Sequence, residues 1–336
     1  MSENEFTWRD DQRTVYFRAG VIADSPEIIA AHGFDEYELL TTERAMGAAP
    51  IDLAEEAACF HHVPPGPVNE IAARMIEDVG DGDLVALGGG RVIDVAKAIA
   101  AVRGVRVAAL PTTLSGAEMT RIHRLSEGWD APHGLTRPEV VLADPPVMTT
   151  MAEQRLRASA MNALGHAADS LYTPLASPPS ELIGLRGASL IAKALDKPPA
   201  KRDPAALALG SILSGYAIDS ALFGLHHVVC QTLVRTLRIP HAETNATMLP
   251  HTMAVLGERA PKQMTALARA LGTKREGLFE RLVELGGGPR ELSELGDATR
   301  EDVGDAVKAI LARPELQMTP NPPGEAEIRS LIEQAW

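Results

Sequence analysis

The sequence contains few cysteines and few aromatic residues, and it has no long apolar run. Cys59 and Cys230 are the two cysteines among 336 residues, too few for a disulfide framework, so a reducing compartment is the simpler interpretation. Phe, Trp and Tyr together make up 4%, so we expect cores of Ala, Leu, Val and Ile. No unbroken apolar run reaches the roughly 18 residues of a membrane helix, and residues 1–6 are acidic without an apolar segment. We therefore expect a cytoplasmic protein without a membrane partner.

Basic residues are also scarce relative to acidic ones. The chain has 32 Lys and Arg against 45 Asp and Glu, a formal net charge of −13, and no block of Lys or Arg. Nucleic acids and anionic membranes are bound by basic patches, so neither is expected as a partner. An anionic substrate would need local positive charge at its binding site to overcome the repulsion from this net negative charge. The hydrophobic fraction of 45% is typical of a globular protein.

Strand and helix patterns alternate over the first part of the chain. This alternation predicts an open, mostly parallel α/β sheet, whereas the stretch at 51–60 is ambiguous between helix and strand. The predicted strands are 14–20, 36–42, 84–87, 105–110 and 139–143. The predicted helices are 25–32, 68–79 and 92–101.

Beyond residue 149 only helical periodicity is found. We therefore predict an α/β dinucleotide-binding domain at 1–148 and an all-helical catalytic or substrate domain at 149–336. The predicted helices of the second domain are 151–173, 179–195, 203–219, 220–236, 242–257, 260–271, 275–285, 300–312 and 324–335.

Three consecutive glycines, Gly88, Gly89 and Gly90, lie between an apolar predicted strand and a predicted helix. Backbone amides at such a position, with the positive end of the helix dipole, can hold a pyrophosphate. The run is not the spaced GxGxxG fingerprint, and it can also be a tight turn without a ligand. The segment PTTLSG at 111–116 follows the neighbouring strand at the same carboxyl edge, where open α/β sheets bind ligands. This second turn favours the nucleotide interpretation.

Two segments resemble the nucleotide-binding motifs of the iron-containing alcohol dehydrogenase family: LGGGRVIDVAK at 87–97 and PTTLSGAEMT at 111–120. Within that family they are most similar to the maleylacetate reductase branch. The similarity continues through NALGH at 162–166, GLHH at 224–227 and PHAETN at 240–245, so it covers nearly the whole chain. It implies a dehydroquinate synthase-like fold, with a dinucleotide domain, a helical domain and the active site in the cleft between them.

The resemblance implies NAD(H) or NADP(H) as the cofactor. Arg91 stands where members of the family often have Ser, and it can either pair with phosphate or be a solvated residue at a helix start. After the second strand, Glu43 would favour NAD, whereas Thr42 and Arg44 would admit a 2′-phosphate, so the choice between the cofactors stays open. The residues that the resemblance places at the cofactor are Gly88, Gly89, Gly90, Arg91, Asp94, Thr112, Thr113 and Ser115.

The resemblance also implies a set of metal ligands. In metal-using members, an Asp and a His one helical turn apart and two later histidines bind a divalent ion; the matching residues here are Asn162, His166, His227 and His241. Asn162 removes the only anionic ligand and so weakens the attraction for Zn²⁺ or Fe²⁺, which makes either ion a candidate but not a requirement. Without an ion, the three histidines can donate hydrogen bonds or positive charge to an anionic substrate. Alternatively, they are hydrogen-bonded residues of a buried interface.

A second departure from the family concerns proton transfer. Many relatives have a histidine where this chain has Gln231, whose amide cannot transfer a proton at neutral pH. Either His226, His241 or water supplies the proton, or the reaction differs from the family norm. His251 is a candidate substrate contact or a core histidine at a helix start, and Cys230 is expected to serve packing.

The reaction that the resemblance implies is hydride transfer from a reduced nicotinamide to a C=C bond conjugated with a carbonyl, giving a 3-oxoadipate-type product. Its partner is a small anionic substrate, and Arg121, His123 and Arg124 are either carboxylate-binding candidates or plain surface residues. The loop at 126–138 lacks a lysine that relatives often have. The alternatives are a metal-dependent alcohol or aldehyde dehydrogenase and a non-redox or non-catalytic family member. The resemblance further implies a homodimer.

Overall fold

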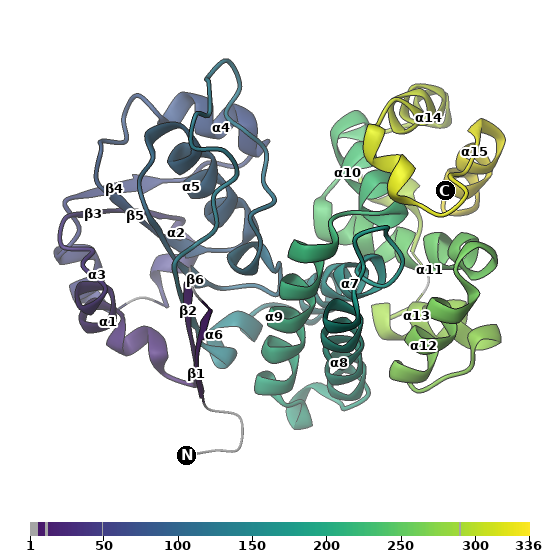
Figure 1. Ribbon diagram of the computed structural model, residues 1–336, viewed down its shortest axis with the longest axis horizontal. Coiled ribbons are helices and arrows are strands. Elements are labelled where there is room, and N and C mark those ends of the chain that lie inside the picture. The colour runs from purple at the N-terminus through teal and green to yellow at the C-terminus, as the bar shows by residue number, and fades with distance from the viewer. Residues whose placement is uncertain (1–5, 11–12, 49, 289) are drawn as a thin grey trace. The chain divides into compact units, whose positions relative to one another are not determined.

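The computed structural model describes residues 6–10, 13–48, 50–288 and 290–336. The chain divides into two compact units, Met1–Thr150 and Met151–Trp336 (Figure 1). Within the described residues no single helix is long and apolar enough to cross a membrane; one bent pair, Pro204–Ala221 with Leu225–Leu237, meets that requirement by length and composition only.

The first unit is built on one sheet, which has seven strands in the residues described. Their order is β1-β2-β7-β6-β5-β3-β4. β1 runs antiparallel to β2 and the other described pairs are parallel, so the prediction of an open, mostly parallel sheet is confirmed. The strands are β1 (Phe6–Asp10), β2 (Arg13–Phe17), β3 (Tyr37–Thr41), β4 (Cys59–His62), β5 (Asp83–Gly88), β6 (Val107–Pro111) and β7 (Val140–Ala143).

Helices cover both faces of this sheet (Figure 1). Leu40 and Ala86 belong to one core with residues of α4 and α5, whereas Leu39 and Val85 belong to a second core with residues of α1 and α3. Neighbouring residues of a strand point to opposite faces, so a strand buried on both faces is apolar throughout, as the run at 84–87 is. The helices of this unit are α1 (Ser25–Ala31), α2 (Glu43–Met46), α3 (Ile51–Glu55), α4 (Val68–Met75), α5 (Gly90–Arg103) and α6 (Pro145–Thr149).

Some boundaries in this unit differ from the sequence predictions. The ambiguous stretch at 51–60 holds both elements, because α3 ends at Glu55 and β4 begins at Cys59. The first predicted strand ends at Phe17 rather than at Gly20, since Gly20 adopts a φ of 77° and a 3-10 helix follows it. β1 is not anticipated by the sequence patterns.

The second unit is helical in the residues described, as expected, and each predicted helix is present. Its helix α7 packs against α8, α9, α10 and α11. The helix predicted at 220–236 begins later, at Leu225, because Leu222 has a φ of 60° and cannot continue a right-handed helix. The helices are α7 (Glu153–Asp169), α8 (Pro178–Leu195), α9 (Pro204–Ala221), α10 (Leu225–Leu237), α11 (His241–Arg259), α12 (Pro261–Ala270), α13 (Leu278–Gly286), α14 (Val303–Leu311) and α15 (Glu325–Gln334).

Candidate active site

One face of α7 carries a buried polar stripe made of Asn162, His166 and Asp169. Their spacing of i, i+4 and i+7 places them on the same side of the helix. Asp169 has an exposed fraction of 0%, and an ionised carboxylate is strongly disfavoured there unless hydrogen bonds or a charge partner compensate. The sequence motifs did not point to Asp169.

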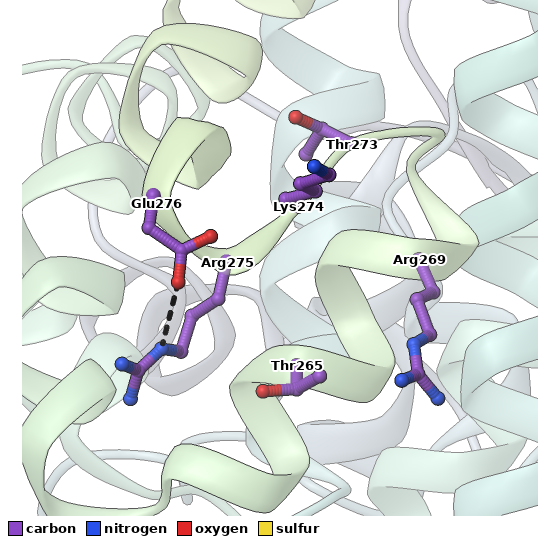
Figure 2. Close-up of a pocket in the computed structure, with 6 residues that line it drawn as sticks. All are labelled: Thr265, Arg269, Thr273, Lys274, Arg275 and Glu276. Atoms are coloured by element: carbon purple, nitrogen blue, oxygen red, sulfur yellow. Dashed lines mark ion pairs between the residues drawn. The ribbon is translucent and has the colours of Figure 1, made fainter.

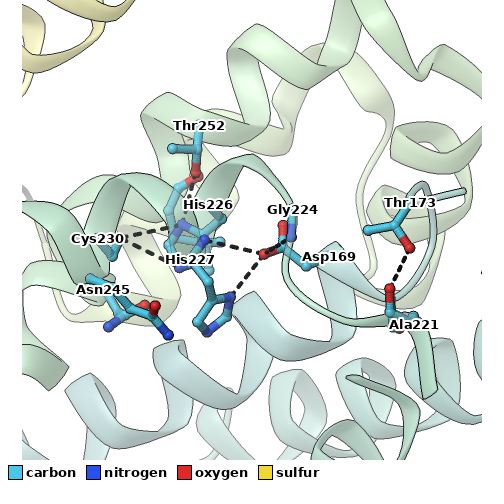
Figure 3. Close-up of polar contacts among 12 residues, drawn as sticks. Asp169, Thr173, Ala221, Gly224, His226, His227, Cys230, Asn245 and Thr252 are labelled. Atoms are coloured by element: carbon cyan, nitrogen blue, oxygen red, sulfur yellow. Dashed lines mark hydrogen bonds and ion pairs between the residues drawn. The ribbon is translucent and has the colours of Figure 1, made fainter. Parts of the chain in front are cut away.

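Four hydrogen bonds converge on the Asp169 carboxylate, and Figure 3 shows those from Gly224 and His227. Its Oδ2 accepts from the backbone N–H of Gly224 at 3.1 Å, the backbone N–H of His227 at 3.2 Å and Nδ1 of His227 at 2.9 Å. Its Oδ1 accepts from the hydroxyl of Tyr172. The start of α10 therefore directs N–H groups at the carboxylate, where the helix dipole also favours an anion. Burial raises the pKa of Asp169, and the bonds from Tyr172, His227 and Gly224 act against that rise.

The bond to Asp169 fixes the state of the His227 ring. Because Nδ1 donates to the carboxylate, Nε2 carries the lone pair, and this buried atom has no hydrogen-bond partner in the described part of the chain. Burial lowers the pKa of His227 well below its usual range, and positive charge on nearby His241 lowers it further. The ring is therefore neutral and offers one acceptor atom. Such an atom can take a proton, accept a hydrogen bond or contact a cation.

Close packing orients the histidine rings. The centroids of His166 and His227 lie 4.6 Å apart with 14° between the ring planes, and Phe223 stacks on His227 at 4.6 Å. Gly165 of α7 allows this approach, because a Cβ there would meet His226 Cδ2 at 2.5 Å and His227 Cε1 at 3.2 Å. The NALGH segment thus needs its glycine for packing as well as its two polar residues for the site.

His226 is held in a separate set of contacts. Its Nδ1 lies 3.0 Å from the Thr252 hydroxyl oxygen, and Asn245 also bonds its side chain. Burial lowers the pKa of His226 to about 3, and it would fall further if the neighbouring His227 ring took a proton. Cys230 Sγ lies 3.7 Å from His226 Nδ1, and burial raises the pKa of this thiol well above its usual range. A neutral, fully buried histidine is a poor proton donor near pH 7, so the geometry favours a structural role for His226.

The other candidates of this unit lie at different depths. His241 is exposed and is the first residue of α11. Gln231 is half-buried and accepts a hydrogen bond from Arg313 at 3.5 Å. His251 is half-buried in the middle of α11, not at a helix start, and burial lowers its pKa.

In the first unit, the two glycine-rich motifs lie against each other. β5 and β6 pair in parallel, with Gly88 opposite Pro111, so their following turns are neighbours. A Cβ at Gly89 would meet Thr113 Cγ2 at 3.0 Å, and one at Gly90 would meet Ser115 Cβ at 2.9 Å. Only glycine permits this approach. Thr112 continues the contact through its backbone N–H, which donates to Gly88 O at 2.9 Å.

Charged residues lie beneath the second motif. Lys97 of α5 is fully buried, pairs with Asp94 at 2.7 Å and donates to the carbonyl oxygens of Ala117 and Ile122 at 3.0 and 3.1 Å. Glu118 is also fully buried, and burial raises its pKa to about 7 although its positively charged neighbours lower it in part. Neither Lys97 nor Glu118 was singled out from the sequence, although both lie inside the quoted motifs.

The remaining cofactor candidates lie nearer the surface. Arg91 is exposed in the first turn of α5. The hydroxyl of Thr42 caps α2 by accepting from the N–H of Ala45 at 3.3 Å.

Of the three substrate-binding candidates in the first unit, Arg121 and Arg124 are exposed. Both ring nitrogens of His123 form hydrogen bonds with the backbone of its own loop. Nδ1 donates to Arg124 O and Nε2 accepts from the N–H of Thr136, each at 3.1 Å. Burial lowers the pKa of His123 to about 4. The geometry therefore favours a loop-holding role for this ring.

A surface pocket of about 520 Å³ lies at α12 and the residues that follow it (Figure 2). None of the candidate residues lines it, so it does not belong to the site around Asp169. Its lining residues are Thr265, Arg269, Thr273, Lys274, Arg275 and Glu276.

Comparison with known families covers both units. Residues 12–145 match the model described as iron-containing alcohol dehydrogenase, and residues 157–336 match that of the Fe-containing alcohol dehydrogenase family, C-terminal. The chain belongs to this family. It falls in the maleylacetate reductase branch and is an oxidoreductase.

Individual relatives agree with this assignment. Maleylacetate reductase 1 of Rhodococcus opacus is 30% identical, over 99% of this chain and 97% of the relative. Among solved structures, an iron-containing alcohol dehydrogenase of Corynebacterium glutamicum is 30% identical with a TM-score of 0.83, covering 98% of this chain and 97% of that one. Maleylacetate reductase of Agrobacterium tumefaciens is 28% identical with a TM-score of 0.82, covering 99% and 98%. The fold is thus that of the dehydroquinate synthase-like proteins, as expected.

Membership of the family implies a nicotinamide dinucleotide and a metal ion, typically iron. The glycine turn fits the dinucleotide. Gly89 caps α5 without any side-chain hydrogen bond, and the glycines leave no side chain over the first turn, so its N–H groups suit a pyrophosphate. Gly88, Gly89, Gly90, Thr113 and Ser115 would hold it.

The metal ligands expected from the family fit an ion less well. Asn162 brings no negative charge, and His166 and His227 lie in nearly parallel planes, so their in-plane lone pairs do not meet at one point. Within the described residues, one group of at least three His, Cys, Asp or Glu has donor atoms that all lie within 4.8 Å of one another. These histidines do not belong to it. With a neutral amide in place of the carboxylate and two stacked imidazoles, this donor set binds a divalent ion less well than the ligand set of the metal-using members.

Proposed function

We propose that this chain is a reductase of the maleylacetate type, which uses NADH or NADPH to reduce a C=C bond conjugated with a carbonyl in a small dicarboxylate. The first unit holds the dinucleotide and the second provides the polar groups for the substrate. The observation that carries the proposal is the buried pair of Asp169 and His227, set beside Asn162 instead of a carboxylate. This arrangement suits an anionic substrate better than a divalent cation.

The reaction adds one hydride and one proton to the substrate. When bound, the reduced nicotinamide supplies the hydride, which goes to the alkene carbon farther from the ketone. The electron pair of the C=C bond then moves toward the carbonyl oxygen, and the carbon next to the ketone takes a proton from the protein or from water. The chain must therefore stabilise negative charge on one oxygen and deliver one proton.

His227 is suited to the first of these tasks. Its Nε2 is an acceptor in the free protein, and Asp169 at 2.9 Å from Nδ1 stabilises the ring when Nε2 takes a proton. The negative charge of an anionic substrate would stabilise the protonated ring further, in addition to the charge of Asp169. We propose that substrate binding is coupled to proton uptake at Nε2, after which the ring donates a hydrogen bond to the enolate oxygen.

The proton route follows from what the other candidates can do. His226 has a pKa of about 3, and Gln231 is an amide, so neither transfers a proton at neutral pH. His241 is exposed, and its charge acts on His227. We propose that the proton enters from water through His241, while Asn162 and His166 bind substrate oxygens.

The proposal is tested by following NADH and NADPH absorbance with maleylacetate and with simple aldehydes, on protein of known metal content. We expect oxidation of at least one cofactor by maleylacetate, and loss of that activity in His227→Ala and His241→Ala while the folded circular-dichroism spectrum is retained.

Other results would contradict the proposal. Activity on aldehydes alone that disappears on chelation would indicate a metal-dependent alcohol or aldehyde dehydrogenase. Dinucleotide binding without turnover of any carbonyl or enone, or no binding, would indicate a non-redox or non-catalytic member. Near wild-type turnover in either histidine variant would make the histidines structural. We also expect a homodimer, which sedimentation would show.

A further inference from the structure

A second cluster of metal-binding side chains lies in the first unit. Within the described residues, Glu38, Cys59 and His61 form the one group of at least three His, Cys, Asp or Glu that offers donor atoms all within 4.8 Å of one another. Glu38 Oε2 and His61 Nε2 are already 2.6 Å apart. Cys59 is a free, exposed thiol. The reaction proposed for the second unit uses none of these residues.

Strand geometry explains why the three side chains meet. β3 and β4 are parallel neighbours at the end of the sheet (Figure 1). Glu38 pairs with Cys59, and Leu40 pairs with His61. Residues two apart on a strand share a face, so Cys59 and His61 point to the same side. Glu38 is directly across from Cys59 on that side. His62, next to His61, faces the opposite side.

The neighbouring backbone fixes the Glu38 carboxylate. A Cβ at Gly80 would meet Glu38 Oε1 at 2.5 Å, and one at Gly82 would meet Glu38 Cγ at 3.8 Å. The carboxylate is therefore enclosed by the segment after α4 on one side, while Cys59 is exposed on the other. An ion could enter from the Cys59 side without any change in the sheet.

We propose that Glu38, Cys59 and His61 form a zinc-binding site. Zn²⁺ commonly takes thiolate, imidazole and carboxylate ligands in tetrahedral geometry, and three protein ligands leave the fourth position to water. Ligand atoms of such a site are separated by about 3.3 to 3.8 Å, so the ion replaces the proton between Glu38 and His61 after a small shift. One thiolate and one carboxylate balance the charge of the ion.

The site is distinct from both cofactor positions implied by the family. Glu38 lies three residues before Thr41, the last residue of β3, which is about 10 Å along the strand from the carboxyl edge. The histidines around Asp169 belong to the other unit. Bound zinc would fasten the last strand, β4, to β3 and so stabilise the first unit.

The test uses the full chain, freed of metal and kept reduced, and titrated with Co²⁺ in place of Zn²⁺. We expect one Co²⁺ per chain with a thiolate-to-cobalt charge-transfer band that excess Zn²⁺ removes. Cys59→Ser abolishes the band, and His61→Ala weakens Co²⁺ binding by more than about tenfold. His62→Ala is the matched control on the opposite face, and Cys230→Ala is the thiol control; both keep the band. Zn²⁺ raises the melting temperature of the wild type but not of Cys59→Ser.

The charge-transfer band separates this site from any ion at the histidines of the second unit, which have no thiolate ligand. A wild-type protein without the band would overturn the proposal, as would a band that persists in Cys59→Ser or disappears in Cys230→Ala. Half an ion per chain would also overturn it, because one ion would then be shared by two copies of the chain. Reductase activity plays no part in the readout.

Discussion

The variant Asp169→Asn tests the buried pair at the centre of the site. The change keeps the shape of the side chain and removes its charge. If the amide oxygen takes the place of Oδ2, it still accepts from Gly224 and from both donors of His227, whereas the amide nitrogen faces the Tyr172 hydroxyl, which must turn. The variant therefore changes mainly the electrostatics around His227.

The expected loss of activity follows from the distance. The charge of a protonated His227 ring is centred about 4 Å from the carboxylate, and at an effective dielectric constant of 20 this attraction is about 4 kcal/mol. Loss of this attraction lowers the population of the protonated His227 ring about 10³-fold. We expect kcat/KM with maleylacetate to fall by about that factor.

Stability should change less than activity. Four charge-assisted hydrogen bonds become neutral ones, which costs about 1 kcal/mol each. Part of this loss is offset because the variant no longer buries a charged carboxylate. We expect a net loss of about 1–3 kcal/mol in the free energy of unfolding, measured by urea denaturation.

Tyr172→Phe is the matched control for this variant. It removes one bond to Oδ1 but keeps the anion, so kcat/KM should stay within about tenfold of the wild type. If Asp169→Asn were folded and retained activity within threefold of the wild type, the pair would not act in the reaction and the proposed proton uptake would be wrong.

Three further changes test other parts of the molecule. Gly90→Ala brings a Cβ to 2.9 Å from Ser115 Cβ, so the dissociation constant for NADH or NADPH should rise about tenfold or more; unchanged binding by calorimetry would show that the turn does not hold the dinucleotide. Gly165→Ala drives a Cβ into His226 at 2.5 Å and should lower the free energy of unfolding by about 1–3 kcal/mol and reduce turnover; an active variant of wild-type stability would contradict the close packing. Burial raises the pKa of Glu118 in the folded protein to about 7 from its usual 4.5, so its ionisation destabilises the fold as pH rises through that interval. Glu118→Gln should therefore gain up to about 3 kcal/mol over the wild type at pH 8 and nothing below pH 4.5; a pH-independent difference in urea denaturation would refute this.

The parts of the fold that were predictable carry short-range signals. The apolar run at 84–87 and the glycines that follow it show a strand buried on both faces and a strand-to-helix turn. β4 was harder to identify, because Cys59, His61 and His62 give an edge strand with little apolar content. The break before α10 depends on the positive φ of Leu222. Leucine rarely adopts a positive φ, so the sequence does not predict this break.

In the candidate active site, too, the sequence predicts short-range features better than contacts between distant residues. Asn162 and His166 can be paired from their i, i+4 spacing, and extending that face by one more turn would have reached Asp169. Its partners Gly224 and His227 are 55 and 58 residues away in sequence, and only tertiary packing brings them together. The neutral state of His226 likewise follows from burial against α11, which spacing does not reveal.

The most direct test of the proposed reaction is to follow the transferred hydrogen. Maleylacetate is reduced with NADH or NADPH that carries deuterium at the transferable position of the nicotinamide, on protein treated with a chelator, and the product is examined by NMR. We expect a 3-oxoadipate product with deuterium on the former alkene carbon farther from the ketone. Deuterium on a carbinol carbon, or turnover only after a divalent metal is restored, would contradict it.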